Sequence, residues 1–248
     1  MTIRIFAGPS LPSGSIQLPP GWIRCPPAKH GDIFRAVRNR PTIIALVDGL
    51  FETVPAVWHK EILWAMAKGI HVYGSSSMGA LRAAELAHFG MRGVGRVFEM
   101  YRDGVLQDDD EVALLHGPAE AGYAPLTDAM VNMRATFTHA ASIGIVEPAA
   151  AAKLVKAAKA LFYKERTYSA VLANAVAADV PPEQITRLAE WLPVGRIDQK
   201  RADALALIET LISHLSSELK PINVGYNFQH TAMWEAARRR ASQRDGSS

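Results

Sequence analysis

The sequence predicts an α/β protein with a parallel-sheet core and flanking helices, followed by an α-helical C-terminal region. Two observations lead to this fold class. In the first half of the chain, short apolar runs alternate with amphipathic helical patterns. In the second half, the composition changes toward alanine and long helical periodicity. A strand-helix-strand-helix order favours parallel strands joined by right-handed crossovers.

The first strand is expected at residues 3–7, where apolar residues alternate before a loop at 8–14 that is rich in proline, serine and glycine. A second short strand is predicted at residues 22–25 and a helix at 32–39. Residues 42–47 form an unbroken apolar run, typical of a strand covered on both faces. Asp48-Gly49 ends that strand.

The next helix is expected to open at Val54-Pro55, because proline fits a first helical turn, and to end at Gly69. A strand at residues 70–73 follows, and then a helix over 77–89 that ends at Gly90. Residues 111–115 are predicted to form a further strand.

Helices are expected over residues 126–143, 148–163 and 168–178. Leucine and isoleucine between residues 205 and 219 mark another amphipathic helix. We therefore divide the chain into an α/β core at residues 1–125, a helical C-terminal region at 126–240 and a disordered tail at 241–248.

Composition narrows the class of protein. The formal net charge is only +3, from 27 basic and 24 acidic side chains, which gives no strong footprint for nucleic acid. Cys25, the single cysteine, excludes an internal disulfide and a multi-cysteine metal site. No apolar run is long enough for a membrane span or a signal peptide. We expect a cytoplasmic protein that binds neither membranes nor nucleic acid.

The most informative segment is Gly74-Ser75-Ser76-Ser77-Met78-Gly79, at a predicted strand-to-helix junction. Ser77 could act as a nucleophile there, with the backbone N–H of Met78 and that of Gly49 forming an oxyanion hole. Asp48 stands at the neighbouring strand end and is a candidate for substrate binding. Two other interpretations stay open: the serines are helix N-caps, or the helix terminus binds an anion without covalent chemistry.

His59 is the nearest candidate base by topology, and Lys60 offers a serine–lysine alternative. His116 is a second candidate base, whereas His71 lies between apolar strand residues and is expected to be packed. Arg82, one turn into the helix after Ser77, could hold a substrate carboxylate or simply pair with Glu85.

A run of acids at Asp108-Asp109-Asp110-Glu111 could orient a histidine or bind a cation, but such runs are usually solvated turns. His59-Lys60-Glu61 lacks the two-histidine spacing of a metalloprotease. We expect no metal site and no cofactor.

Several motifs together resemble the TfuA-like family over about residues 1–125. The longest is the segment from Gly74 to Leu86, GSSSMGALRAAEL. The others are GPSL at 8–11, VDG at 47–49, HKEIL at 59–63, GMRGVG at 90–95 and DDEV at 109–112. A second resemblance, of Ser77-Met78-Gly79-Ala80 to the nucleophile segment of Clp-type serine peptidases, is weaker. Those peptidases carry the base histidine downstream of the serine, whereas His59 lies upstream.

The TfuA-like resemblance implies an accessory role beside a YcaO-domain enzyme, which installs thioamides by activating a backbone amide with ATP. Two roles are implied: releasing sulfide from a thiocarboxylated, ThiS-like sulfur carrier, or recruiting and activating YcaO. Our leading hypothesis is a hydrolase in which Ser77 attacks the thiocarboxylate, Gly49 and Met78 hold the oxyanion and His59 handles protons.

Two competing hypotheses stay open. In the first, the protein is a non-catalytic partner that docks on YcaO and helps bind the precursor peptide. In the second, it is a phosphate- or nucleotide-binding module built on the loop at 8–14 and the helix terminus. That loop lacks Walker-type spacing and a lysine, so we rank this interpretation last.

Overall fold

A computed structural model describes residues 1–50, 54–216 and 219–243. They form two compact units, one of residues 1–107 with 202–248 and one of residues 108–201. The first unit contains an all-parallel five-stranded sheet, which confirms the predicted fold class. The strands are β1 (Ile3–Phe6), β2 (Trp22–Cys25), β3 (Ile43–Leu46), β4 (His71–Ser75) and β5 (Arg92–Val94).

The sheet has the strand order β2-β1-β3-β4-β5. This is a doubly wound order, in which the chain reverses its direction of travel between β1 and β3. Ile3 pairs with Ile43, and Ile43 pairs with His71, so the three central strands start in register. Their carboxyl ends therefore lie at one edge of the sheet, which is where doubly wound proteins bind ligands.

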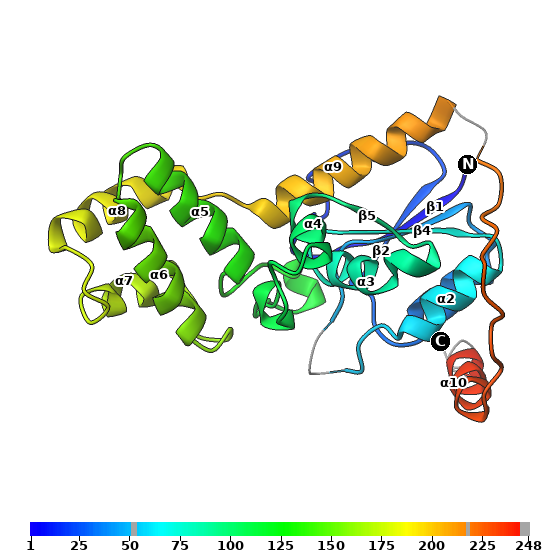
Figure 1. The fold of residues 1–248 in the computed structure, drawn as a ribbon. Coiled ribbons are helices and arrows are strands. Elements are labelled where there is room, and N and C mark those ends of the chain that lie inside the picture. Colours follow the sequence, from blue (N-terminus) through cyan, green and yellow to red (C-terminus); the bar gives the residue numbers. More distant parts are fainter. Residues whose placement is uncertain (51–53, 217–218, 244–248) are drawn as a thin grey trace. The chain divides into compact units, whose positions relative to one another are not determined.

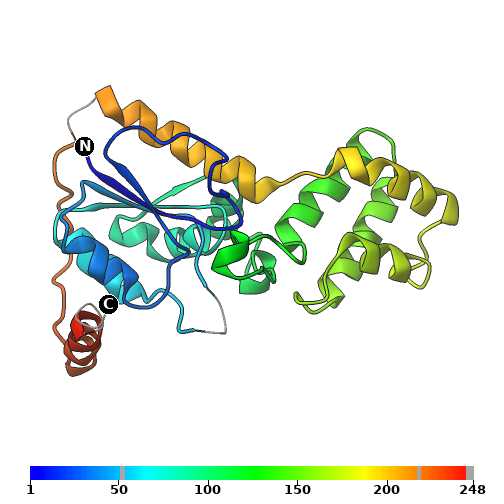
Figure 2. The same cartoon turned by 180° about the vertical axis from the view of Figure 1, so that it is seen from behind.

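Helices cover both faces of this sheet, as Figures 1 and 2 show from opposite sides. Five helices of the first unit are α1 (Asp32–Val37), α2 (His59–Ala67), α3 (Met78–Leu86), α4 (Arg96–Arg102) and α9 (Gln199–Ser213). The apolar side of α9 packs on one face, where Leu207 and Leu211 share a buried cluster with Ile3, Ile5 and Tyr73. On the other face lie α2 and α3.

The last helix, α10 (Ala232–Gln243), is held to the first unit by aromatic side chains. Trp234 is 1% exposed and lies between Phe34, Trp64 and Phe228, with ring centroids 5.1 to 5.9 Å apart. Burial of one such aromatic side chain is worth about 3 kcal/mol. The C-terminal segment is thus an integral part of the sheet-containing unit.

The second unit is helical and has its own core. Its helices are α5 (Met130–Ser142), α6 (Pro148–Ala160), α7 (Tyr168–Ala175) and α8 (Pro182–Gly195). Phe137, Leu154, Val171 and Leu188 are fully buried in one cluster.

Short 3₁₀ helices occur in both units. They are η1 (Ala87–Phe89) and η4 (His214–Ser216) in the first unit, and η2 (Asp109–Glu111) and η3 (Ala119–Ala121) in the second.

Several sequence-based boundaries need correction. The helix expected from Val54-Pro55 begins only at His59, and residues 111–115 form no strand, because η2 and a turn occupy them. The strand β5 and the helix α8 were not predicted. The helix α10 extends to Gln243, so the first three residues of the predicted disordered tail are helical, and residues 244–248 lie outside the described residues. The predicted domain boundary after residue 125 differs from the limits of the compact units at 107 and 201.

Candidate functional site

The turn between β4 and α3 is sharp and depends on glycine. A Cβ atom at Gly79 would lie 1.7 Å from the carbonyl oxygen of Leu46, and one at Gly74 would lie 2.0 Å from that of Gly79. The Gly79 N–H donates to the Val47 carbonyl at 3.1 Å. Without side chains at these two positions, the first turn of α3 can rest directly on the ends of β3 and β4.

The backbone of the turn is strained at Ser76. This residue has a φ of 68°, in the left-handed region that non-glycine residues rarely adopt. The Ser77 N–H donates to the Ser75 carbonyl at 2.8 Å, which closes a γ-turn around Ser76. Strained turns of this kind are concentrated at functional sites, where they fix the direction of a neighbouring side chain.

The three serine hydroxyls of the turn have three different environments. Ser75 Oγ donates to the carbonyl of Asp203 on α9 at 2.9 Å. Ser76 Oγ is completely enclosed and has no hydrogen-bond partner among the described residues. Ser77 occupies the N-cap position of α3, yet its side chain makes no capping hydrogen bond and the residue is 3% exposed. The capping interpretation therefore does not account for the Ser77 hydroxyl.

The two candidate oxyanion donors are close to each other in the fold. A Cβ atom at Gly49 would lie 2.2 Å from Met78 Sδ, so the backbone after β3 packs on the first residue of α3. Neither the Gly49 N–H nor the Met78 N–H donates to another described residue. Both groups can therefore donate to a ligand, and the N-terminus of α3 favours negative charge there.

The Asp48 carboxylate bonds to the loop after β1, whereas the sequence suggested that it could bind substrate. Its carboxylate is 2% exposed and accepts the N–H groups of Gly8 and Ser10 at 2.7 and 3.0 Å, and the Ser10 hydroxyl at 2.6 Å. The motif at 8–10 and the motif at 47–49 are thus one structural feature. It ties the loop after β1 to the end of β3, at the point where the strand order reverses.

His59 contacts Glu85 rather than Ser77. Its Nε2 atom lies 2.8 Å from Glu85 Oε2, and Arg82 Nη1 donates to the same oxygen at 2.6 Å. Burial opposes the ionisation of Glu85, but the hydrogen bonds from His59 and Arg82 outweigh it and hold the pKa of Glu85 below its usual value. Glu85 is eight residues beyond Ser77, about 12 Å along the axis of α3. The structure therefore orients His59 with a carboxylate but does not bring it to Ser77.

A groove of about 500 Å³ lies beside this His59–Glu85–Arg82 cluster. Its walls are the segment before α2, one side of α3 and the exposed side of α10. The described residues that line it are His30, Ala56, Val57, Trp58, His59, Arg82, Met233, Ala236, Ala237 and Arg240. The basic run at 238–240 thus contributes one arginine to the groove, while Arg238 pairs with Glu235 at 3.0 Å.

The other candidate bases have structural partners. Lys60 Nζ donates to Thr231 Oγ1 at 3.0 Å, and His71 Nε2 lies 2.8 Å from the carbonyl of Lys220. His71 is 5% exposed, in agreement with the packed role expected for it. His116, in the helical unit, lies 2.8 Å from the Gly117 carbonyl and stacks edge-on with Tyr123.

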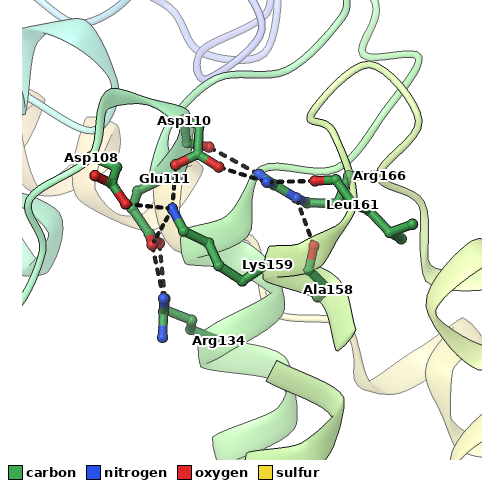
Figure 3. A network of polar contacts seen from close by, with 8 residues as sticks. All are labelled: Asp108, Asp110, Glu111, Arg134, Ala158, Lys159, Leu161 and Arg166. Atoms are coloured by element: carbon green, nitrogen blue, oxygen red, sulfur yellow. Dashed lines mark hydrogen bonds and ion pairs between the residues drawn. The ribbon is translucent and has the colours of Figure 1, made fainter. Parts of the chain in front are cut away.

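The acidic run at 108–111 belongs to an ion-pair network within the helical unit, shown in Figure 3. Glu111, 3% exposed, receives two hydrogen bonds of 2.8 Å from Arg134 and lies 3.1 Å from Lys159. Asp110 pairs with Lys159 and, at 2.7 Å, with Arg166, which is 1% exposed.

The guanidinium of Arg166 also donates to the carbonyls of Ala158, Leu161 and Asp110. Asp110 and Glu111 therefore hold the chain to α5 and α6 and orient no histidine, whereas Asp108 and Asp109 are exposed. Among the described residues, no group of three or more histidine, cysteine or acidic side chains is placed to bind a metal ion.

Some residues of the site could not be found from the sequence. Asp203 lies more than a hundred positions from the turn that it contacts, and Arg240 reaches the groove from the last helix. The strain at Ser76 has no sequence signal, because serine is not a residue that marks positive φ. His59 and Glu85 are 26 residues apart, on two different helices.

The fold and the turn define a doubly wound α/β protein that has a serine at the N-terminus of a helix, beside backbone N–H groups that donate to no other described residue. The family model of TfuA-like proteins matches residues 48–167. This match confirms, over that segment, the resemblance to the TfuA-like family that the sequence motifs indicate. The matched segment includes the serine turn, the His59–Glu85–Arg82 cluster and the ion-pair network. No curated protein matches the sequence.

Among the described residues, none of the helices combines the length and the apolar character that crossing a bilayer demands.

Proposed function

We propose that this protein serves a YcaO-domain enzyme by hydrolysing the C-terminal thiocarboxylate of a ThiS-like sulfur carrier, with Ser77 as the nucleophile. The match to the TfuA-like family supports an accessory role in a YcaO-type system. One observation carries the finer proposal. Ser77 has a hydroxyl that makes no capping hydrogen bond, beside the N–H groups of Gly49 and Met78, which donate to no other described residue.

The chemistry suits these groups. Ser77 Oγ attacks the carbonyl carbon of the thiocarboxylate, a C–O bond forms and the C–S bond breaks. The hydroxyl proton leaves with the sulfur as HS⁻, so charge and atoms balance and an acyl ester remains on Ser77. The N–H groups of Gly49 and Met78 would stabilise the negative oxygen of the tetrahedral intermediate that forms before the C–S bond breaks.

Water then hydrolyses the ester and releases the carrier with an ordinary carboxylate. The leaving sulfur accepts the first proton, so the first step does not require a histidine in contact with Ser77. His59 is the proposed base for the second step, but it is paired with Glu85 and does not contact Ser77, so this role requires the bound carrier to bring the two residues closer together. Arg82, beside it, is proposed to attract the acidic end of the carrier.

The test compares two serines of the same turn. Wild type, Ser77→Ala and Ser76→Ala are each mixed with thiocarboxylated carrier, and sulfide is measured without YcaO. We expect Ser77→Ala to lose more than about a thousandfold in rate. Ser76→Ala should retain most of the activity, because the Ser76 hydroxyl is enclosed. Equal rates for all three proteins would contradict the proposal.

A second candidate function rests on the groove. His59 and Arg82 are already paired with Glu85, and Met233 is 71% exposed beside them, which suits a docking surface. In this alternative, the protein recruits or activates YcaO and helps bind the precursor peptide, without catalysis.

Supplying sulfide in two forms separates the two functions. If Ser77→Ala supports thioamidation with inorganic sulfide but not with the thiocarboxylated carrier, the hydrolase is correct. If Ser77→Ala equals wild type with both sulfur sources, while Met233→Glu abolishes thioamidation with both, the docking role is correct.

A further inference from the structure

A second cavity lies at the opposite edge of the sheet, where the strands begin. It has a volume of about 810 Å³, within the range that binds small molecules. Its walls are the link from α1 to β3, the link from α2 to β4 and the segment after η4. It therefore has no wall in common with the serine turn or with the groove beside His59.

The charge of this cavity has one sign. Arg38, Arg40 and Lys68 line it, and none of the described lining residues is acidic. Arg40 forms no ion pair with a described residue, and Lys68 lies over the ring of Trp64, 5.7 Å from its centroid. Three cations around one small cavity attract a ligand that carries several negative charges.

Helix ends explain only part of this charge. Arg38 and Lys68 directly follow α1 and α2, where a cation offsets the negative end of the helix dipole. Arg40 lies beyond the helix, has a φ of 46° and precedes Pro41, so its backbone is held in a rarely adopted conformation. A strained position that presents a cation to a cavity is characteristic of a ligand clamp.

The rest of the cavity lining combines apolar side chains with one histidine. Trp64, Leu219 and Pro221 supply apolar surface, and His71 closes one side. His71 Nε2 contacts the Lys220 carbonyl at 2.8 Å, which holds the segment after η4 against the sheet. His71 Nδ1 is buried and has no hydrogen-bond partner among the described residues.

We propose that this cavity binds a polyphosphate group, either free or carried by a nucleotide, at a site separate from Ser77. Arginine and lysine are the side chains that bind phosphate oxygens most strongly, and here they converge from two consecutive loop connections. The proposal does not depend on the hydrolase function, since no residue of the cavity belongs to the serine turn.

Calorimetric titration of the whole protein with inorganic triphosphate and, separately, with ATP tests this proposal at physiological ionic strength. Wild type is expected to bind both ligands at one site. Arg40→Gln and Lys68→Gln should each weaken the binding about tenfold. Arg96→Gln is the matched control, because the Arg96 side chain is 65% exposed on α4 and away from the cavity, and it should bind as wild type does.

Three results would overturn the proposal: no saturable binding of either ligand, binding of ATP without binding of triphosphate, or equal weakening by Arg96→Gln. Sulfide release by Arg40→Gln should match that of wild type. The binding test therefore gives the same result whether or not the protein is a hydrolase, and the sulfide-release test gives the same result whether or not the cavity binds polyphosphate.

Discussion

The serine turn after β4 and the acidic run at 108–111 are both conspicuous polar motifs in the sequence. They differ in whether their polar side chains find partners within the protein. In the acidic run, the carboxylates of Asp110 and Glu111 bind cations of α5, α6 and the segment before α7. In the turn, the Ser76 hydroxyl has no partner among the described residues, and the Ser77 hydroxyl makes no capping hydrogen bond. Polar groups that bind one another stabilise a fold, whereas the Ser77 hydroxyl, which makes no capping bond, is left for a ligand; the Ser76 hydroxyl is enclosed and is not.

This contrast predicts opposite effects on stability when the polar groups are removed. Asp110→Ala should destabilise the helical unit by about 2 kcal/mol, because Arg166 would remain buried with fewer acceptors. Amide hydrogen exchange in α6 and α7 measures the loss. Asp109→Ala is the matched control: Asp109 is exposed in the same run and should be neutral. Equal protection in the two variants would show that the network contributes nothing.

A buried carboxyl group of the sheet unit gives an effect that depends on pH. Glu61 is 1% exposed and accepts the N–H groups of Gly31 and Phe34 at 2.7 and 3.2 Å. Burial raises its pKa to about 7, from 4.5, despite these hydrogen bonds. The folded state therefore holds the proton more tightly than the unfolded state, and the stability that this proton contributes is lost as the pH rises from 4.5 through 7.

Melting temperatures of wild type and Glu61→Gln between pH 4.5 and 8 test this prediction. The advantage of wild type over the variant should shrink as the pH rises. Glu99→Gln, at a side chain that is 46% exposed, should follow the wild-type curve. A constant difference between wild type and Glu61→Gln across this range would mean that Glu61 does not titrate there.

The smallest expected effect is at Ser76. Glycine relieves the cost of a φ of 68° and removes the enclosed hydroxyl, while it loosens the unfolded chain. Ser76→Gly should leave the free energy of unfolding unchanged or raise it by up to about 1 kcal/mol, measured by urea denaturation. A clear loss of stability would show that the Ser76 hydroxyl has a structural role, contrary to the comparison above.

The sequence predicts the central strands and α3 well, because unbroken apolar runs and glycines such as Gly69 and Gly90 mark their limits directly. It fails at residues 111–115, where a polar run followed by apolar residues is typical of a strand edge. The ion pairs of Glu111 with Arg134 and Lys159 hold this segment in a turn instead, and those partners are distant in sequence.

The site shows the same limit. The Ser77 turn and the neighbouring Gly49 follow from strand ends and glycines, which are local signals. Three other features depend on tertiary contacts. His59 pairs with Glu85, the loop at 8–10 donates hydrogen bonds to Asp48, and α9 packs on the sheet. Spacing along the chain contains no information on these contacts.

The proposed hydrolysis depends on a covalent bond between Ser77 and the carrier. This bond can be detected from the intact mass of the protein, measured after mixing with thiocarboxylated carrier and rapid acid quenching. An ester on Ser77 should appear as an adduct that equals the mass of the two proteins less hydrogen sulfide, present in wild type and absent in Ser77→Ala. Sulfide release by Ser77→Ala at the wild-type rate, with no adduct in either protein, would contradict the proposed hydrolysis.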